Sequence, residues 1–323
     1  MQDGQKGYAS LTYSPTLVRF FHYSAQDADD QNLLFTARYP FQRLTLDAAE
    51  AYSQSSGVNQ DTNTRTQQTT QVSTAGLNYE IDDKLNLTSH VQEVDTTYAQ
   101  GEGQGDTTDS VNSSLSYQVS DKLRVGPSAN FGQDKPKNGT GPGGNFGSGN
   151  QLKSNYEQAL LGVFYQPTEK ITGNAQAGME FRQYDDNGGD QANPIFALGL
   201  GYNPFDSTNL SLNAYGNSRA SSANAGQSVM TTGVGFSATQ RFIQRFFLNL
   251  SVSYEHDDYQ STGNNTGTPS YTEDSWVYRP SLTFDPTLWT AVGLYYQYQD
   301  NKSDGVGVSY HDNQFGISIS AQF

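Results

Sequence analysis

The sequence predicts an all-β protein, a transmembrane up-and-down antiparallel β-barrel of about 16 strands, and about 14 or 18 strands are also compatible with the pattern. Three observations support this fold class. The chain of 323 residues is only 34% hydrophobic, yet it is 12% aromatic, contains 32 glycines and carries a net charge of -15. Apolar and polar residues alternate with a period of two. The joints between the alternating segments are short and long in turn, as in outer-membrane barrels.

The composition excludes several other classes of protein. An ordinary soluble domain is roughly 45–50% apolar, so this chain has too few aliphatic residues for a core of its size. Its many aromatic residues argue against disorder. No run of about 18 apolar residues, as a transmembrane helix requires, is present. The absence of cysteine excludes disulfides and thiolate metal sites, and the acidic balance argues against nucleic acid as a partner.

The alternation is clearest at the C-terminus, where Phe315, Ile317, Ile319, Ala321 and Phe323 alternate with small or polar residues. Alternation of this kind indicates a strand with one apolar and one polar face. It recurs along a single domain, residues 1–323, after a short N-terminal periplasmic segment, residues 1–11. The expected strands are 12–24, 31–39, 43–55, 69–80, 84–98, 108–119, 122–133, 152–166, 170–184, 193–203, 208–220, 228–239, 244–257, 273–284, 288–300 and 309–323.

The alternative all-β fold is a soluble sandwich, whose strands also alternate. It needs a dry interior between two sheets, whereas the polar faces here hold Gln, Asn, Arg and Glu. An even number of strands places both ends of the barrel sheet on the periplasmic side. Because hydrocarbon offers no hydrogen-bond partners to the backbone, we expect the last strand to pair with the first.

Aromatic residues recur just before the short turns and predict a ring at the periplasmic interface, where an apolar ring and a polar tip both find their solvent. They are Tyr79, Tyr117, Tyr165, Tyr202 and Phe284. The terminal alternation ending in a C-terminal aromatic resembles the signal that the barrel assembly machinery reads. We therefore expect this machinery as a partner, with Phe315, Ile317, Ile319 and Phe323 as the assembly signal.

About 16 strands leave an aqueous channel rather than a packed interior. Charged residues on the polar faces are candidates for its lining, and rings of charge set selectivity in pores. With an acidic mouth and a wall of mixed sign, the sequence predicts mild cation preference. The glycine-rich loop 134–152 is either an inward constriction or an exposed tip. The lining candidates are Arg19, Arg38, Asp47, Arg124, Glu180, Arg182, Arg219, Glu255 and Arg279.

The residues that could carry catalysis are dispersed, and we expect no enzyme. The four histidines, His22, His90, His256 and His311, fall on separate expected strands. His256-Asp257 and His311-Asp312 lie near the extracellular rim and are more simply explained as solvated polar residues than as a catalytic pair.

Acidic residues in the expected extracellular loops suggest a second kind of site. Asp185, Asp186 and Asp190 form a run of carboxylates that could hold Ca²⁺ through oxygen ligands. The hypothesis is that divalent cations bridge such loops to lipopolysaccharide, and a plain solvated acidic rim is the alternative. No other cofactor is expected.

The last third of the chain resembles a family of outer-membrane β-barrel porins that are often associated with exopolysaccharide gene clusters in Gram-negative bacteria. The resemblance rests on Trp276-Val277-Tyr278-Arg279-Pro280, on the tyrosine-rich run 292–298, on Asn301-Lys302-Ser303-Asp304 and on Tyr310-His311-Asp312-Asn313-Gln314-Phe315. Lys302 stands where the family usually has arginine. The resemblance covers roughly residues 244–323 and implies the fold and the cell outer membrane as location.

Three functions are compatible with these features. The leading one is a porin-like channel for passive passage of small polar solutes. The second is a conduit for a secreted polysaccharide, with sugars stacking on Tyr215, Phe247 and Tyr295. The third is a structural or adhesion barrel that displays surface loops. Whether the barrel forms oligomers stays open, because a flat apolar subunit face has the same sequence pattern as a lipid-facing one.

Overall fold

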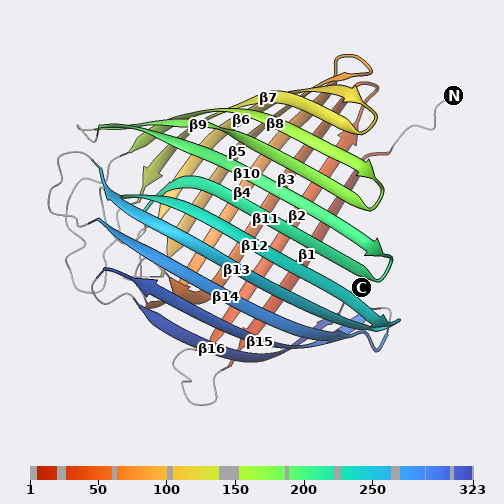
Figure 1. Ribbon diagram of the computed structural model, residues 1–323, viewed down its shortest axis with the longest axis vertical. Coiled ribbons are helices and arrows are strands. Elements are labelled where there is room, and N and C mark those ends of the chain that lie inside the picture. Colours follow the sequence, from red (N-terminus) through yellow and green to blue (C-terminus); the bar gives the residue numbers. More distant parts are fainter. Residues whose placement is uncertain are drawn as a thin grey trace.

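The computed structural model describes residues 6–19, 27–59, 64–99, 105–137, 153–185, 189–221, 227–262, 270–287, 289–305 and 309–321. These residues form sixteen strands of 11 to 17 residues, in one sheet that curls into a nearly closed barrel (Figure 1). The strands are β1(Tyr8–Val18), β2(Ala28–Pro40), β3(Leu44–Asn59), β4(Thr64–Glu80), β5(Leu85–Tyr98), β6(Asp106–Ser120), β7(Leu123–Pro136), β8(Ser154–Thr168), β9(Ile171–Tyr184), β10(Asp190–Phe205), β11(Thr208–Ala220), β12(Gln227–Ile243), β13(Phe246–Ser261), β14(Tyr271–Phe284), β15(Thr290–Ser303) and β16(Tyr310–Ala321). In the part of the chain that the structure describes, no helix is long and apolar enough to cross a membrane.

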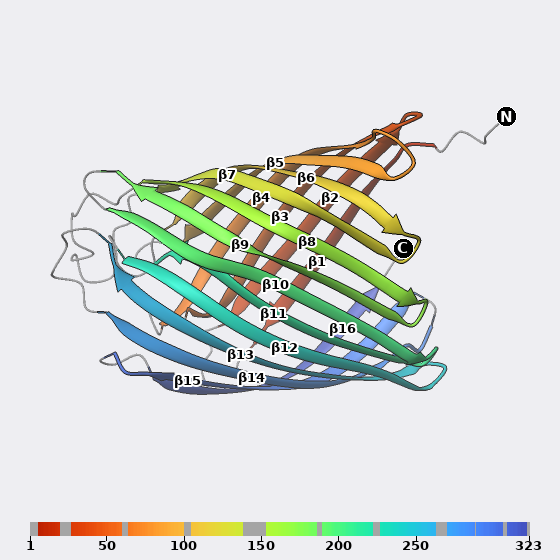
Figure 2. The same cartoon turned by 45° about the horizontal axis from the view of Figure 1, so that its top comes forward.

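Each strand pairs antiparallel with the next one in the chain, from β1 to β16. This meander confirms the predicted up-and-down topology and the predicted number of strands. Short turns join the strands at one end of the barrel, on the right in Figures 1 and 2, and β1 begins and β16 ends at that same end. Both ends of the sheet therefore lie on the side that faces the periplasm in outer-membrane barrels.

The expected pairing of the last strand with the first is not found among the described residues. Here β1 pairs only with β2, and β16 pairs only with β15, so the sheet keeps two edges. On one of these edges Pro15 lacks the N–H group that a closing ladder would use.

The first strand differs from its expected position, residues 12–24. It begins at Tyr8, inside the segment expected to precede the barrel, and it ends at Val18. Pro15 lies within this strand and is paired in register with Gln31 of β2. A proline is tolerated there because β1 is an edge strand with one neighbour.

Several other strands extend farther toward the extracellular side than predicted. The strand expected to start at residue 69 begins at Thr64, and the strand expected to end at residue 133 continues to Pro136. Apolar alternation marks only the part of a strand that crosses lipid, whereas the backbone ladder continues into polar sequence. Asp134, expected in a loop, consequently belongs to β7.

The two faces of the sheet differ in burial. On the concave inner face, side chains at the extracellular half crowd together, and Glu180, Arg182 and Tyr259 are almost fully buried. On the convex outer face, apolar residues such as Leu161 and Leu250 stay exposed, as expected for side chains that contact lipid. The cross-strand register keeps each set on its own face around the whole sheet, because side chains alternate with a period of two.

Exposed aromatic side chains form two bands on the outer face. The periplasmic band carries Tyr79, Tyr117, Tyr165 and Tyr202, and it ends in the stacked pair Phe246–Phe284, whose ring centroids are 4.5 Å apart. The extracellular band is concentrated on β13–β16, where ring contacts link Tyr254 to Trp276, Trp276 to Tyr278, Tyr278 to Tyr298 and Tyr296 to Phe315. The lipid-facing zone lies between these bands.

Two substitutions on β13, one on each face of the strand, test the assignment of the two faces. Leu250→Arg places a charge in the lipid-facing zone and should lower the free energy of unfolding by about 2–4 kcal/mol. Ser253→Arg, on the inner face, should change it by about 0.5 kcal/mol or less. Urea unfolding in phospholipid vesicles measures both values, and equal losses for the two variants would contradict the assignment.

Candidate functional site

The inner wall is the part of the barrel that a passing solute would meet. The register places most of the predicted lining residues on it, at several heights. Arg19 is the exception: it follows β1, donates to the carbonyl of Ala28 and forms a 2.6 Å ion pair with Asp29, which belongs to the outward-facing set. The residues on the inner wall are Arg38, Asp47, Arg124, Glu180, Arg182, Arg219, Glu255 and Arg279.

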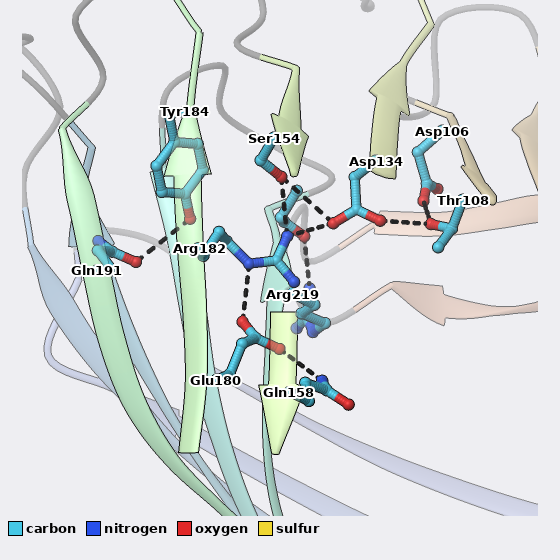
Figure 3. A network of polar contacts seen from close by, with 11 residues as sticks. Asp106, Thr108, Asp134, Ser154, Gln158, Glu180, Arg182, Tyr184, Gln191 and Arg219 are labelled. Atoms are coloured by element: carbon cyan, nitrogen blue, oxygen red, sulfur yellow. Dashed lines mark hydrogen bonds and ion pairs between the residues drawn. The ribbon is translucent and has the colours of Figure 1, made fainter. Parts of the chain in front are cut away.

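Arg182 on β9 is the centre of a buried polar network on this wall (Figure 3). Its Nε donates to Glu180 Oε1 at 2.8 Å, and its Nη1 donates to Ser154 Oγ at 2.9 Å and to the carboxylate of Asp134. Glu180 in turn accepts a 2.7 Å hydrogen bond from Gln158 Nε2. These partners lie on β7, β8 and β9, so one guanidinium connects three strands.

The network extends farther around the wall through Asp134. Its Oδ1 accepts a 2.7 Å hydrogen bond from Thr108 Oγ1 on β6. Arg182 also lies over the ring of Tyr156, 4.8 Å from its centroid, a cation–π contact. That ring lies close to Gly132, where a Cβ atom would come within 2.3 Å of the ring. A larger residue at position 132 would therefore displace the tyrosine ring from this place.

The single guanidinium of this network is shared by two carboxylates, Glu180 and Asp134. The side chains of Arg182 and Glu180 are 3% and 0% exposed, so burial without partners would be very unfavourable. The arrangement therefore fixes the extracellular ends of β6–β9 and offers little charge to a solute. Sequence reasoning identified Glu180 and Arg182 but missed Asp134 and Ser154, because Asp134 was assigned to a loop.

A second ion pair, between a buried carboxylate and a partly exposed guanidinium, lies on the same wall. Arg219 Nη2 on β11 is 3.3 Å from Asp257 Oδ2 on β13, and Asp257 also accepts a 2.5 Å hydrogen bond from Thr231 Oγ1. Asp257 is only 2% exposed. This pair ties β11 to β13 across β12, as the Arg182 network does for β6–β9.

Two other arginines are exposed on the inner wall and lie over aromatic rings. The guanidinium of Arg124 is 4.7 Å from the ring centroid of Phe164, and that of Arg279 is 4.8 Å from that of Tyr295. The ring of Tyr295 also packs on Gly316 of the next strand. Its predicted role in sugar stacking would require the arginine to move aside.

Tyr215 and Glu255 line a wall pocket of about 280 Å³ on β11–β14. The Tyr215 hydroxyl donates a 2.5 Å hydrogen bond to Glu255 Oε2, and the pocket also includes Asn213 and the serines at 251, 253 and 275. A carboxylate, an amide and hydroxyl groups around an aromatic ring are suited to hydroxyl-rich molecules. Phe247, the remaining candidate for sugar stacking, lies lower on the wall, opposite Thr283.

The histidines do not form a common site in the described residues. His90 Nε2 is 3.4 Å from Asp47 Oδ2 on the inner wall. His256 Nδ1 contacts Asp274 Oδ1 at 2.9 Å on the outward-facing set, rather than its sequence neighbour Asp257, because neighbouring residues of a strand face opposite ways. His311 Nδ1 is 2.6 Å from Asp300 Oδ1, and His22 lies outside the described residues.

The calcium hypothesis stays a prediction. Asp186, one of its three residues, lies outside the described part of the chain, whereas Asp185 and Asp190 flank that gap. No group of three or more His, Cys, Asp or Glu residues that could hold a metal ion is found in the residues that the structure describes. Phe323 of the assembly signal and loop residues 138–152 also lie outside them, whereas Phe315, Ile317 and Ile319 face outward on β16.

Comparison with known proteins identifies the family. The family model described as "Putative beta-barrel porin 2" matches residues 48–323. The chain belongs to this family. The match confirms the porin family to which the C-terminal motifs are similar, and it extends that resemblance to most of the barrel. A search of curated proteins finds no relative by sequence.

Solved structures with a similar fold are outer-membrane barrels. The FrpB iron transporter from Neisseria meningitidis (F3-3 variant) is 10% identical, with a TM-score of 0.55 over 99% of this chain and 63% of that protein. Its F5-1 variant is 11% identical, with a TM-score of 0.54 over 99% and 64%. The ferric citrate transporter FecA in its unliganded form is 14% identical, with a TM-score of 0.50 over 96% and 58%.

This chain therefore spans about three fifths of the length of those transporters. At these identities the likeness shows the fold alone. Together with the family, it places this porin-family member in the outer membrane.

Removal of the Arg182 side chain tests the buried network. Arg182→Ala leaves Glu180 and Asp134 without their cation and should lower the free energy of unfolding by about 3–5 kcal/mol. Arg279→Ala removes an exposed arginine that lies over the ring of Tyr295, and it should lower the free energy of unfolding by about 1 kcal/mol or less. Combining Arg182→Leu with Glu180→Gln and Asp134→Asn should recover part of the lost stability. If Arg182→Ala lowers the free energy of unfolding no more than Arg279→Ala does, the stabilising role of the Arg182 network is contradicted.

Proposed function

We propose that the protein is a porin-like channel of the outer membrane for passive passage of small polar solutes, without catalysis and without a resident cofactor. The observation that carries the proposal is the inner wall itself. Charged side chains that keep contact with solvent lie on it at successive positions from β2 to β14, among them Arg38, Asp47, Arg124 and Arg279. A wall of this kind is favourable only next to water.

The porin family supports the same function, and the buried networks fit it as well. Arg182 and Asp257 are occupied by neighbours on the wall, so they hold the channel shape without binding solute. The groups free to meet solutes are of mixed sign. Weak selectivity follows from such a lining.

Planar-bilayer recording of the purified protein tests this proposal. We expect ohmic conductance and, across a KCl gradient, a reversal potential that reports mild cation preference. Asp47→Asn combined with Glu255→Gln should weaken this preference, because both carboxylates lie on the inner wall. Asp83→Asn, in a short turn, serves as the matched control. Absence of conductance would refute an open channel, and clear anion selectivity would refute the predicted preference.

A conduit for secreted polysaccharide is the second candidate, favoured by the wall pocket of Tyr215 and Glu255. Its volume of about 280 Å³ admits a single sugar ring, and its hydroxyl, amide and carboxylate groups can bond to sugar hydroxyls. A chain of linked sugars could move along the wall from one such contact to the next.

Channel block by maltohexaose, used as a neutral oligosaccharide probe, separates the two candidates. A conduit for polysaccharide should be blocked at millimolar concentration, and Tyr215→Ala should weaken the block. Tyr298→Ala, on the outer face, should leave the block unchanged. If the conductance is insensitive to the oligosaccharide, the simple porin function is favoured.

A further inference from the structure

One sector of the outer face is unlike the rest of the lipid-facing surface. On β13–β15 the outer face is apolar and aromatic up to and including the extracellular aromatic band, with residues such as Leu250, Trp276 and Tyr296. On β3–β6 the same zone carries carboxylates and small side chains. We call this sector the acidic groove, and it consists of Ala48, Glu50, Ser73, Ala75, Val91, Glu93, Asp109 and Val111.

The carboxylates of the acidic groove lie at the depth of the membrane. Glu50 is six residues along β3 from Leu44, at the periplasmic end of the strand, and Glu93 is eight residues along β5 from Leu85. At about 3.3 Å per residue and a tilt of about 40°, these positions are about 15 and 20 Å above the periplasmic aromatic band. Both fall within an apolar band about 25 Å tall.

Not every carboxylate of the acidic groove is paired with a cation in the described residues. Glu93 and Asp109 are directly opposite each other on β5 and β6, a destabilising juxtaposition of like charges. Lys135 Nζ pairs with Asp109 Oδ2 at 2.5 Å. Within the described residues, Glu93 has no hydrogen-bond or ion-pair partner. Nearby, Glu50 Oε1 accepts a 2.6 Å hydrogen bond from Gln71 Nε2, and the side chain of Ser73 also hydrogen-bonds to Glu50, so this carboxylate has polar partners but no cation among the residues that the structure describes.

The small side chains of this sector leave a depression in the outer face. A groove of about 840 Å³ crosses β3–β6, with Ala48, Ser73 and Ala75 in its lining between the larger side chains of Phe35 and Phe131. Small residues allow another backbone to approach closely, and polar residues hold protein segments together inside membranes. Ionisable side chains at this depth are costly in contact with acyl chains and indicate a function.

From these observations we infer that the acidic groove is a docking surface for a membrane-embedded segment of a different protein that carries lysine or arginine. Charge complementarity selects this partner. A cation placed beside Glu93 would offset its repulsion from Asp109 and would also be attracted to Glu50, which has no cationic partner in the described residues.

A second copy of this chain does not meet this requirement. Between the two aromatic bands, no outward-facing residue of the described chain is Lys or Arg; the outward-facing cations, such as Lys135 and Lys302, lie near the extracellular ends of their strands. Two copies meeting through the groove would bring carboxylates together.

The test uses the folded barrel in neutral phosphatidylcholine vesicles. The chain has no cysteine, so Asp83→Cys in the turn below the groove provides a single site for a donor fluorophore. The probes are two synthetic Leu/Ala-rich membrane helices of about 22 residues with an acceptor fluorophore. One helix carries lysine at the depth of Glu93, and the other carries glutamine there.

We expect energy transfer to show at least about tenfold tighter binding of the lysine helix than of the glutamine helix. Glu93→Gln should remove this difference, whereas Glu169→Gln, in a periplasmic turn, should preserve it. Equal binding of the two helices would overturn the inference. So would energy transfer between labelled barrels that disappears in Glu93→Gln, because that result assigns the groove to a second copy.

A measurement of stability separates contact with lipid from contact with water. Without a partner the groove faces acyl chains, so Glu93→Leu should make the barrel more resistant to urea unfolding in vesicles while abolishing selective binding of the lysine helix. Unchanged or reduced resistance would place the groove in water and contradict the inference. The channel proposal does not depend on this outcome, because the groove lies on the outer face.

Discussion

Backbone amides and carbonyls inside a bilayer have no water to bond to, and the whole architecture follows from this constraint. Each of the sixteen strands finds its partners in the next strand of the chain, so a simple meander satisfies the backbone from β2 to β15. Within the described residues two edges remain, on β1 and β16, and there the outer backbone groups have no neighbouring strand to bond to. The proline at position 15 lies on one of them.

The continuous ladder fixes the register, and the register sorts every side chain to one of two environments. On the inner face this brings together charges that are distant in sequence, such as Arg182 and Asp134, which are 48 positions apart. Such buried pairs are favourable only when every charge has a partner, and here the partners lie on three neighbouring strands. The inner wall thus combines compensated charges that hold its shape with exposed charges that can meet solutes.

On the outer face the same sorting reveals an asymmetry of the barrel. The aromatic contacts of β13–β16 are typical of a surface at the lipid interface. The carboxylates of β3–β6 at comparable depth are not, and they are the basis for assigning a protein partner to that sector. The outer face of the barrel therefore has an apolar, aromatic side on β13–β16 and a more polar side on β3–β6, although the backbone of the sheet is nearly uniform. The polar side is the one that we assign to a protein neighbour.

Much of this protein is determined by the sequence alone. Period-two alternation and the rhythm of short and long joints are local properties of the chain, so they predicted the fold class, the number of strands and the periplasmic aromatic band. Local patterns are weaker at strand ends, where polar residues continue the ladder. For this reason Asp134 was expected in a loop and Arg19 was expected on the inner wall.

Only the tertiary structure decided which residues meet. The contact of Arg182 with Asp134, the opposition of Glu93 and Asp109, and the edges left at β1 and β16 all depend on the register between strands. Register is set by pairing across the whole sheet, and a shift of one residue would exchange the two faces of a strand. Alternation therefore determines that a strand has two faces, whereas the folded sheet determines what each face contacts.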